Sequence, residues 1–315
     1  MKILLANPRG FCAGVERAIK IVNYALLIYG PPIYVWHEIV HNEFIINEFK
    51  KKGVIFTENL KKIRKNSILI FSAHGVSEKI KKKVKKLHLK NLFDATCPLV
   101  SNIHMEVKKA SLNNKEIIFI GNAGHQEVKG TIGQYYNKNG GIYLVESKKD
   151  IWKLKIKNEQ NLYYITQTTL SKYDTMHIVK EIYKRFPNIQ SSKLNNICYA
   201  TINRQEAIYN LAKKTDIILI VGSKNSSNAN RLKEISEKIG KPSYLINSYH
   251  DINIKWIKNI KKIGITAGAS VPNIIIDNII TFFKKQGINK IIELNGKNEN
   301  VNFKLPRNLQ KLIKK

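Results

Sequence analysis

The sequence predicts an α/β protein built from three similar units, each with a parallel sheet. Two observations predict this class. Short apolar runs rich in Ile and Val alternate with helical patterns along the whole chain. Three cysteines recur 85 and 101 residues apart, each after a strand-like stretch and before a helical one. We therefore expect each unit to contribute one cysteine from a junction between a strand and a helix.

The strands are predicted from continuous apolar runs. These runs lack the alternation that is typical of half-exposed antiparallel strands, which favours strands buried in parallel sheets. The predicted strands are Ile3–Ala6, Ile33–Trp36, Ile68–Phe71, Leu92–Ala95, Ile117–Gly121, Ile142–Val145, Leu162–Thr166, Ile217–Gly222, Ser243–Ile246 and Ile263–Thr266.

Three predicted helices end at glycine, the residue that most readily adopts the left-handed conformation after a helix. They are Ala13–Tyr29 before Gly30, Asn42–Lys52 before Gly53 and Asn228–Ile239 before Gly240. With the cysteine repeat, these elements predict an N-terminal strand with the first cysteine, three units and a C-terminal extension that packs back on the core. The predicted bounds are 1–13, 14–97, 98–196, 197–283 and 284–315.

Composition excludes several classes of protein. The 315 residues are 43% apolar, which argues against a mainly disordered chain, and three cysteines are too few for a disulfide scaffold. No apolar run approaches the roughly 18 residues of a membrane span, and the apolar stretch at the N-terminus is too short for a signal peptide. We therefore expect a cytoplasmic protein with reduced thiols and no membrane association.

The net charge of +31 raises the question of nucleic-acid binding. Of the 54 basic residues only seven are Arg, whereas proteins that read nucleic acids usually enrich Arg. Runs such as Lys81–Lys83 are typical of a solvated helix face. We expect no nucleic-acid partner, although a positive field can attract acidic partners or phosphorylated substrates.

Five predicted strands run directly into small, polar turns. In open α/β sheets such turns lie at the carboxyl edge, where ligands meet the N-termini of helices. One such turn is most simply a helix cap, but five in one chain indicate an anionic ligand such as a diphosphate. The turns follow Phe71, Gly121, Thr166, Gly222 and Thr266, and contain His74, His125, Thr168, Ser226, Ser227, Asn228 and Ser270.

The three cysteines point to a metal centre. A single cytosolic cysteine is usually a small buried apolar residue, but Cys12, Cys97 and Cys198 occupy equivalent junctions. If the units face one another, three thiolates converge. They would suit either an iron–sulfur cubane with one iron that lacks a protein ligand, or a zinc ion completed by His or water.

Among the histidines, His41, His74 and His125 fall in loops or helix starts that also carry Asn, Gly and Glu. His37 is undecided. The others are predicted to be structural or solvated: His88, His104, His177 and His250. Glu127 follows His125 by two residues, and pattern alone leaves it equally a helix cap or a proton donor.

Four motifs resemble those of one family. They read NPRGFCAGV at Asn7–Val15, DATCPLV at Asp94–Val100, AGHQEV at Ala123–Val128 and VGSKNSSN at Val221–Asn228. In this order and spacing they resemble the 4-hydroxy-3-methylbut-2-enyl diphosphate reductases of the IspH/LytB family, which catalyse the last step of the non-mevalonate isoprenoid pathway. The likeness extends from residue 1 to about residue 306.

The resemblance implies three α/β units in a pseudo-threefold arrangement around a cavity that holds a [4Fe–4S] cluster. It implies that Cys12, Cys97 and Cys198 bind three irons, which leaves one iron for the substrate. It also implies that Glu127 is the proton donor and that Thr168 orients the substrate hydroxyl or its water. The positions implied to surround the diphosphate and its chain are His41, His74, His125, Thr168, Ser226, Ser227, Asn228 and Ser270.

The implied reaction is a reductive dehydroxylation by two electrons and two protons, giving isopentenyl and dimethylallyl diphosphate. The implied partners are the allylic diphosphate substrate and reduced flavodoxin or ferredoxin as electron donor, and we expect a monomer. This chain departs from the family in its Lys-rich surface, as in Lys79–Lys86 and Lys311–Lys315. Two other functions remain open on the residues alone: a zinc-dependent hydrolase that uses the same Cys and His residues, and a basic RNA-binding protein without catalysis.

Overall fold

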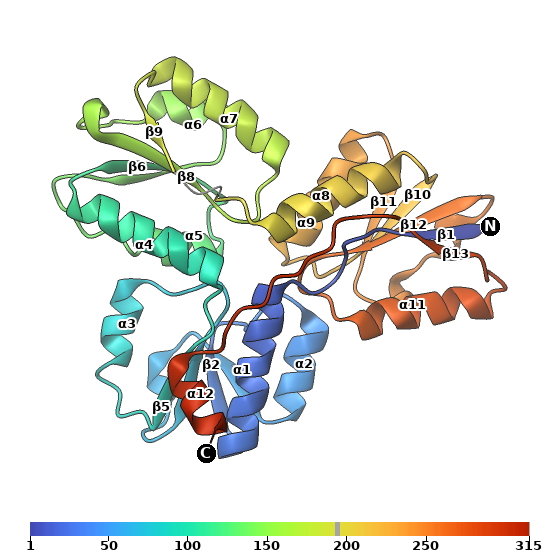
Figure 1. Ribbon diagram of the computed structural model, residues 1–315, viewed down its shortest axis with the longest axis horizontal. Coiled ribbons are helices and arrows are strands. Elements are labelled where there is room, and N and C mark those ends of the chain that lie inside the picture. Colours follow the sequence, from blue (N-terminus) through green and yellow to red (C-terminus); the bar gives the residue numbers. More distant parts are fainter. Residues whose placement is uncertain (193–195, 315) are drawn as a thin grey trace. The chain divides into compact units, whose positions relative to one another are not determined.

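The chain forms three parallel sheets flanked by helices, which confirms the predicted α/β class (Figure 1). The computed structural model describes residues 1–192 and 196–314. Residues 193–195 of the predicted second unit and Lys315 of the Lys-rich tail lie outside the described residues. Every strand pair in the described chain is parallel.

The first sheet combines both ends of the chain in the order β11-β10-β12-β1-β13. Its strands are β1 (Lys2–Leu5), β10 (Ile217–Val221), β11 (Ser243–Ile246), β12 (Lys262–Ala267) and β13 (Ile291–Glu293). The helices between them are α8 (Tyr199–Ala212), α9 (Ser227–Lys238), α10 (Ile254–Ile257) and α11 (Asn273–Lys285), with a 3₁₀ turn at Tyr249–Asp251.

Both faces of this sheet are buried because successive side chains of a strand point to opposite sides. Ile3 and Leu5 pack with α10 and α11, whereas Leu4 and Ala6 pack with α8 and α9. This two-sided burial explains why the strands read as unbroken apolar runs.

The second sheet has the order β3-β2-β4-β5. Its strands are β2 (Ile33–Trp36), β3 (Val54–Thr57), β4 (Ile68–Phe71) and β5 (Asn91–Asp94). The accompanying helices are α1 (Ala13–Tyr29), α2 (Glu43–Lys51), α3 (Glu78–Val84) and α12 (Arg307–Ile313), with a 3₁₀ turn at Leu60–Lys62. Hydrogen bonds from Asn91 to the Tyr29 hydroxyl and from Asn308 to the Leu92 carbonyl tie α1 and α12 to β5.

The third sheet has the order β7-β6-β8-β9. Its strands are β6 (Glu116–Ile120), β7 (Ile142–Val145), β8 (Leu162–Thr166) and β9 (Gln190–Ser191). Its helices are α4 (Pro98–Leu112), α5 (Gln126–Ile132), α6 (Lys148–Lys153) and α7 (Lys172–Arg185), with a 3₁₀ turn at Glu159–Asn161. Ile103 and Val107 of α4 and Val128 of α5 pack on Ile117, Phe119 and Ile165 of the sheet.

The chain divides into two compact units. Unit 1 holds the first sheet and comprises Met1–Val15, His41–Glu48 and Tyr199–Asn302. Unit 2 holds the second and third sheets and comprises Glu16–Val40, Phe49–Cys198 and Phe303–Lys315.

All ten predicted strands are present, and the three predicted helices are α1, α2 and α9. Sequence reasoning missed three strands of the described chain, β3, β9 and β13, and each of them is the edge of its sheet. No helix among the described residues is both long and apolar enough to cross a membrane.

Candidate functional site

Each cysteine lies directly before a helix. Cys12 precedes α1, Cys97 is the N-terminal cap of α4 with Pro98 at its first position, and Cys198 precedes α8. All three are partly exposed, and they form no disulfide bond within the part of the chain that the structure describes. Each cysteine therefore lies at the positive end of a helix dipole.

Each cysteine is also bonded to a turn that follows a strand. The backbone N–H of Cys12 donates to the Ala269 carbonyl (3.1 Å), that of Cys97 to the Ala73 carbonyl (3.0 Å) and that of Cys198 to the Thr168 carbonyl (3.0 Å). Two of the acceptors, Ala269 and Ala73, directly precede Ser270 and His74 in the sequence. The third acceptor, Thr168, is itself a predicted site residue. Within each unit, the structure therefore joins every cysteine to a turn that carries predicted ligand-binding residues.

Glu127 and Thr168 form the most buried polar pair of the predicted site. Glu127 lies in the first turn of α5 and is 3% exposed. Its carboxylate accepts hydrogen bonds from the backbone N–H and the hydroxyl of Thr168, both at 2.7 Å. Burial raises the pKa of Glu127 to about 7, although both hydrogen bonds from Thr168 lower it. A carboxyl group with this pKa can release a proton near neutral pH.

The histidines of unit 2 lie in a row beside this pair. His125 caps α5, and its Nδ1 accepts the Glu127 N–H at 3.2 Å. The ring centroid of His74 is 5.9 Å from that of His125 and 5.8 Å from that of His37. His37 Nδ1 lies 2.6 Å from the Glu58 carboxylate, which fixes the orientation of the ring. His37, undecided from sequence, therefore joins the predicted His74 and His125.

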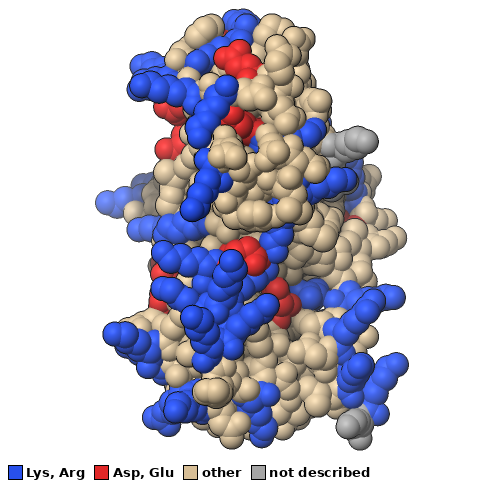
Figure 2. All heavy atoms as spheres, turned by 90° about the vertical axis from the view of Figure 1, so that its left-hand side faces the viewer, with Lys and Arg blue, Asp and Glu red and all other residues tan. Residues whose placement is uncertain are grey.

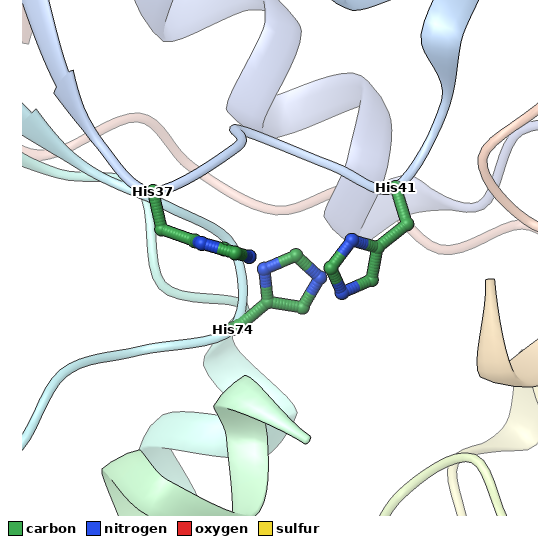
Figure 3. A group of neighbouring side chains, drawn as sticks. All are labelled: His37, His41 and His74. Carbon is green, nitrogen blue, oxygen red and sulfur yellow. The ribbon is translucent and has the colours of Figure 1, made fainter. Parts of the chain in front are cut away.

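The loop between β2 and α2 carries both His37 and His41, while His74 follows β4 (Figure 3). His41 belongs to unit 1, where its carbonyl accepts a hydrogen bond from the Ser270 hydroxyl at 2.9 Å. Ser270 follows Ala269, the partner of Cys12. The Ser270 hydroxyl and the Ala269 carbonyl thus link His41 and Cys12 within one unit.

The start of α9 supplies the remaining polar residues of unit 1. Ser226 caps this helix, its hydroxyl accepting the Ala229 N–H at 3.3 Å, and Ser227 is the first helical residue. Asn228 is 5% exposed, and its Oδ1 accepts the Ala269 N–H at 3.2 Å. Its Nδ2 is buried with no hydrogen-bond partner among the described residues. A buried amide donor without a partner is costly, which indicates a position prepared for an acceptor oxygen.

Sequence reasoning missed one residue that shapes these turns. Gln167 is fully buried, accepts the Asn122 N–H at 2.9 Å and donates to the Thr169 hydroxyl at 3.0 Å. It thereby joins the turn after β6 to the turn after β8. The sequence could have indicated a role for Gln167, because it stands beside Thr168 in one of the polar turns that follow a predicted strand.

The comparisons with known proteins agree over nearly the whole chain. The family profile described as LytB protein matches residues 3–284. A 4-hydroxy-3-methylbut-2-enyl diphosphate reductase from Proteus mirabilis is 54% identical over 310 residues, which cover 98% of each chain. One from Hamiltonella defensa is also 54% identical and covers 98% of this chain and 97% of the relative.

Two solved structures are also similar. The E-1-hydroxy-2-methyl-but-2-enyl-4-diphosphate reductase from Plasmodium falciparum has a TM-score of 0.94 and 39% identity, and the match covers 99% of this chain and 98% of that one. An (E)-4-hydroxy-3-methyl-but-2-enyl diphosphate reductase has a TM-score of 0.66 and 31% identity, with 90% and 100% coverage. From its motifs, fold and relatives, the chain belongs to the LytB protein family.

Proposed function

We propose that the chain reduces (E)-4-hydroxy-3-methylbut-2-enyl diphosphate to isopentenyl and dimethylallyl diphosphate, the last step of the non-mevalonate isoprenoid pathway. In this reaction the allylic C–O bond breaks, a C–H bond forms and the oxygen leaves as water, with uptake of two electrons and two protons. The observation that carries the proposal is a chain of hydrogen bonds in which the Cys198 N–H donates to the Thr168 carbonyl, and the Thr168 N–H and hydroxyl donate to the Glu127 carboxylate. It joins a buried proton source to a predicted metal ligand.

The cysteines fit a [4Fe–4S] cluster by their chemistry. All three, Cys12, Cys97 and Cys198, are partly exposed, directly precede helices, and donate a backbone hydrogen bond to a turn that follows a strand. Three thiolates leave one iron of a cubane without a protein ligand. When bound, such a cluster supplies electron transfer and Lewis acidity.

Unit 1 supplies groups for the diphosphate. From unit 1 we assign this role to Ser226, Ser227, Asn228 and Ser270, with His41 as a further donor, and we also assign it to His74 and His125 of unit 2. The unpartnered Nδ2 of Asn228 supports the assignment, since phosphate oxygens are strong acceptors. The N-terminus of α9, a helix of 12 residues, adds backbone N–H groups and a favourable dipole. Binding at the diphosphate fixes the geometry of the reacting carbon, which lies at the other end of the substrate.

Unit 2 supplies the proton. Glu127 holds it, and the Thr168 hydroxyl, 2.7 Å from the carboxylate, is placed to pass it on to the substrate oxygen. Because protonation makes the oxygen a better leaving group, it lowers the barrier to C–O cleavage.

The electrons require a donor protein, and we propose reduced flavodoxin or ferredoxin acting in the cytoplasm. Figure 2 shows that Lys and Arg greatly outnumber Asp and Glu on the face it presents. A surface with this charge attracts an acidic partner and raises the rate of encounter at low salt.

An anaerobic assay tests the proposal. The purified protein is given the hydroxylated diphosphate and a chemical reductant, and both products are measured by mass spectrometry. We expect both products to form only with the reductant. Release of phosphate without reductant, by colourless protein that contains zinc, would instead identify a zinc-dependent hydrolase.

A further inference from the structure

Three charged side chains connect the cysteines in pairs. The first connects Cys12 with Cys97, the second Cys97 with Cys198 and the third Cys198 with Cys12. Each lies on the helix that follows one cysteine, and each is hydrogen-bonded to described residues that precede another. Arg17 follows Cys12, Glu106 follows Cys97 and Arg204 follows Cys198. The function described above assigns none of them a role.

Arg17, which is 9% exposed, holds the loop before Cys97. Its guanidinium donates to the Thr96 carbonyl at 3.0 Å and to the Asp94 carbonyl at 3.3 Å. Its Nε donates to the Lys304 carbonyl at 2.7 Å, so the C-terminal segment fixes the same side chain. All of these groups lie in unit 2.

Glu106 holds the residues before Cys198. Its carboxylate accepts a bifurcated hydrogen bond from the Ser192 hydroxyl, with each carboxylate oxygen at 2.9 Å, and another from Asn196 Nδ2 at 3.4 Å. Asn196, two residues before Cys198, also accepts the Thr166 N–H at 3.1 Å. Asn196 is thus held both by the Glu106 carboxylate on α4 and by the end of β8.

Arg204 holds the loop before Cys12 and is completely buried. It donates to the Gly10 carbonyl at 2.7 and 3.1 Å and to the Phe11 carbonyl at 3.2 Å. It also donates to the Ala200 carbonyl, two residues after Cys198, at 2.9 Å. Its charge is balanced by Glu299 of the C-terminal segment at 3.1 Å. All of these groups lie in unit 1.

We propose that Arg17, Glu106 and Arg204 are positioning residues for the three cysteine ligands. Each fixes the backbone approach to one cysteine from the helix that begins at another. If one of these contacts is lost, the backbone before its cysteine becomes more mobile and the thiolate is less well oriented. Iron binding is then weaker. This inference rests on the proposed function, because it takes the cysteines to be the ligands.

The test uses Arg17→Lys, Glu106→Gln and Arg204→Lys. Lysine keeps the charge but cannot make the forked contacts of the guanidinium. Two residues hold loops away from the cysteines by the same chemistry and give matched controls. Arg185→Lys removes the guanidinium that bonds the Ile151 and Leu154 carbonyls, and Glu116→Gln alters the carboxylate that accepts the N–H groups of Lys157 and Asn158.

The first measurement is hydrogen exchange of the iron-free proteins, followed by mass spectrometry of peptides. We expect Arg17→Lys to speed exchange at residues 94–97, Glu106→Gln at 196–198 and Arg204→Lys at 10–12. Each control should speed exchange only in its own loop. A uniform rise across the chain, or a rise confined to the helix that carries the substitution, would overturn the proposal.

The second measurement is the rate at which the reconstituted proteins release iron to a chelator under argon. We expect release about tenfold faster in the three variants, as for other partners that orient metal ligands, with the controls close to wild type. Release at the wild-type rate in all three would also overturn the proposal.

A milder variant keeps the test decisive if Arg204→Lys fails to fold. Glu299→Gln leaves the arginine in place and weakens its charge-assisted bond, so exchange at residues 10–12 should still rise. Unchanged exchange there would refute the role of Arg204. Failure of wild-type protein to bind iron would remove the proposed function instead, while the exchange pattern would still decide whether these residues position the loops.

Discussion

At the scale of single residues, Glu127 shows how burial suits a carboxyl group to the proton-donor role that we propose for it. An exposed glutamate is ionised at neutral pH, but here the loss of water around the carboxylate outweighs two hydrogen bonds from Thr168 and raises the pKa to about 7. The same burial makes the side chain depend on Thr168 for its hydrogen bonds. A change in Thr168 is therefore expected to alter the pKa of Glu127 as well.

Glu127→Gln is expected to reduce turnover about a hundredfold or more, the usual effect of losing a general acid. Glutamine has nearly the same shape and can still accept from Thr168, so iron content and KM should stay close to wild type. Steady-state kinetics on anaerobic protein measure both parameters. A variant with near-normal kcat would remove Glu127 from this role.

The pH dependence of wild-type kcat should follow the same carboxyl group. Because its folded-state pKa lies near 7, above the ordinary value of 4.5, the proton is present below about pH 7 and is lost above it. We expect kcat to fall about tenfold per pH unit on the alkaline side. Glu127→Gln should lose this limb in a profile measured with a chemical reductant, and a variant that retained it would indicate another titrating group.

Asn228→Ala is expected to weaken substrate binding. The buried Nδ2 would lose its bond to a phosphate oxygen, worth about 1.5 to 3 kcal/mol for a charged partner, so KM should rise about tenfold to a hundredfold. The Oδ1 bond to Ala269 disappears as well, so Asn228→Asp is the informative companion. It keeps that acceptor and places a negative charge at the diphosphate. If it bound substrate as well as wild type, Asn228 would not be a phosphate ligand.

The cysteines, by contrast with Glu127, could be recognised from sequence because their junctions repeat. Sequence left Glu127 open between helix cap and proton donor, since its pKa depends on burial that only the packing of α5 against the turn after β8 provides. Arg17, Glu106 and Arg204 could not be found, because charged residues on helices are ordinary. Their partners before the cysteines are 77 to 194 positions away in the sequence.

At the scale of elements, two of the three strands missed from sequence have no buried residue. In β13 two of the three residues are exposed, and β9 has only two residues, both exposed. In β3 the second residue is exposed and the third half-buried. An edge strand has a neighbour on one side only and needs fewer apolar residues, which explains β9 and β13, whereas β3 was missed although it carries the apolar run Val54–Phe56.

Helix α4 carries a histidine that makes the fold sensitive to acid. His104 is 5% exposed, and burial, with a smaller effect from Lys81, lowers its pKa to about 4. Its ring lies against the turn that contains His74, because a side chain at Gly75 would meet His104 Cε1 at 2.5 Å. Gly75 also has a φ of 79°, which favours glycine.

The sign of this effect follows from the lowered pKa. Below pH 6.5 the unfolded chain takes up a proton at His104 that the folded chain takes up only near pH 4. Folding stability is therefore lost as the pH falls through this window, by about 3 kcal/mol in all. His104→Leu should remove this loss, so its unfolding free energy relative to wild type should rise between pH 7 and pH 4. Urea unfolding of the iron-free proteins measures the difference, and a constant difference would show that His104 does not titrate here.

At the scale of the whole molecule, the parallel sheets and the cysteine repeat were predictable, but the strand order was not. Strand β1 lies between β12 and β13, so the first sheet needs both ends of the chain. Local pattern does not contain such long-range pairing. The C-terminal segment is similarly tied to Arg204 through Glu299 and to Arg17 through Lys304, contacts that join residues more than ninety positions apart.

The central claim is that Cys12, Cys97 and Cys198 together bind one iron–sulfur cluster. Iron and sulfide analysis of anaerobically purified protein, compared with Cys97→Ser, tests it most directly. We predict brown wild-type protein that absorbs near 400 nm and holds about four iron and four sulfide per chain, and a variant that loses cluster and activity together. Colourless wild-type protein containing zinc, or a Cys97→Ser variant with its full complement of iron, would contradict the account.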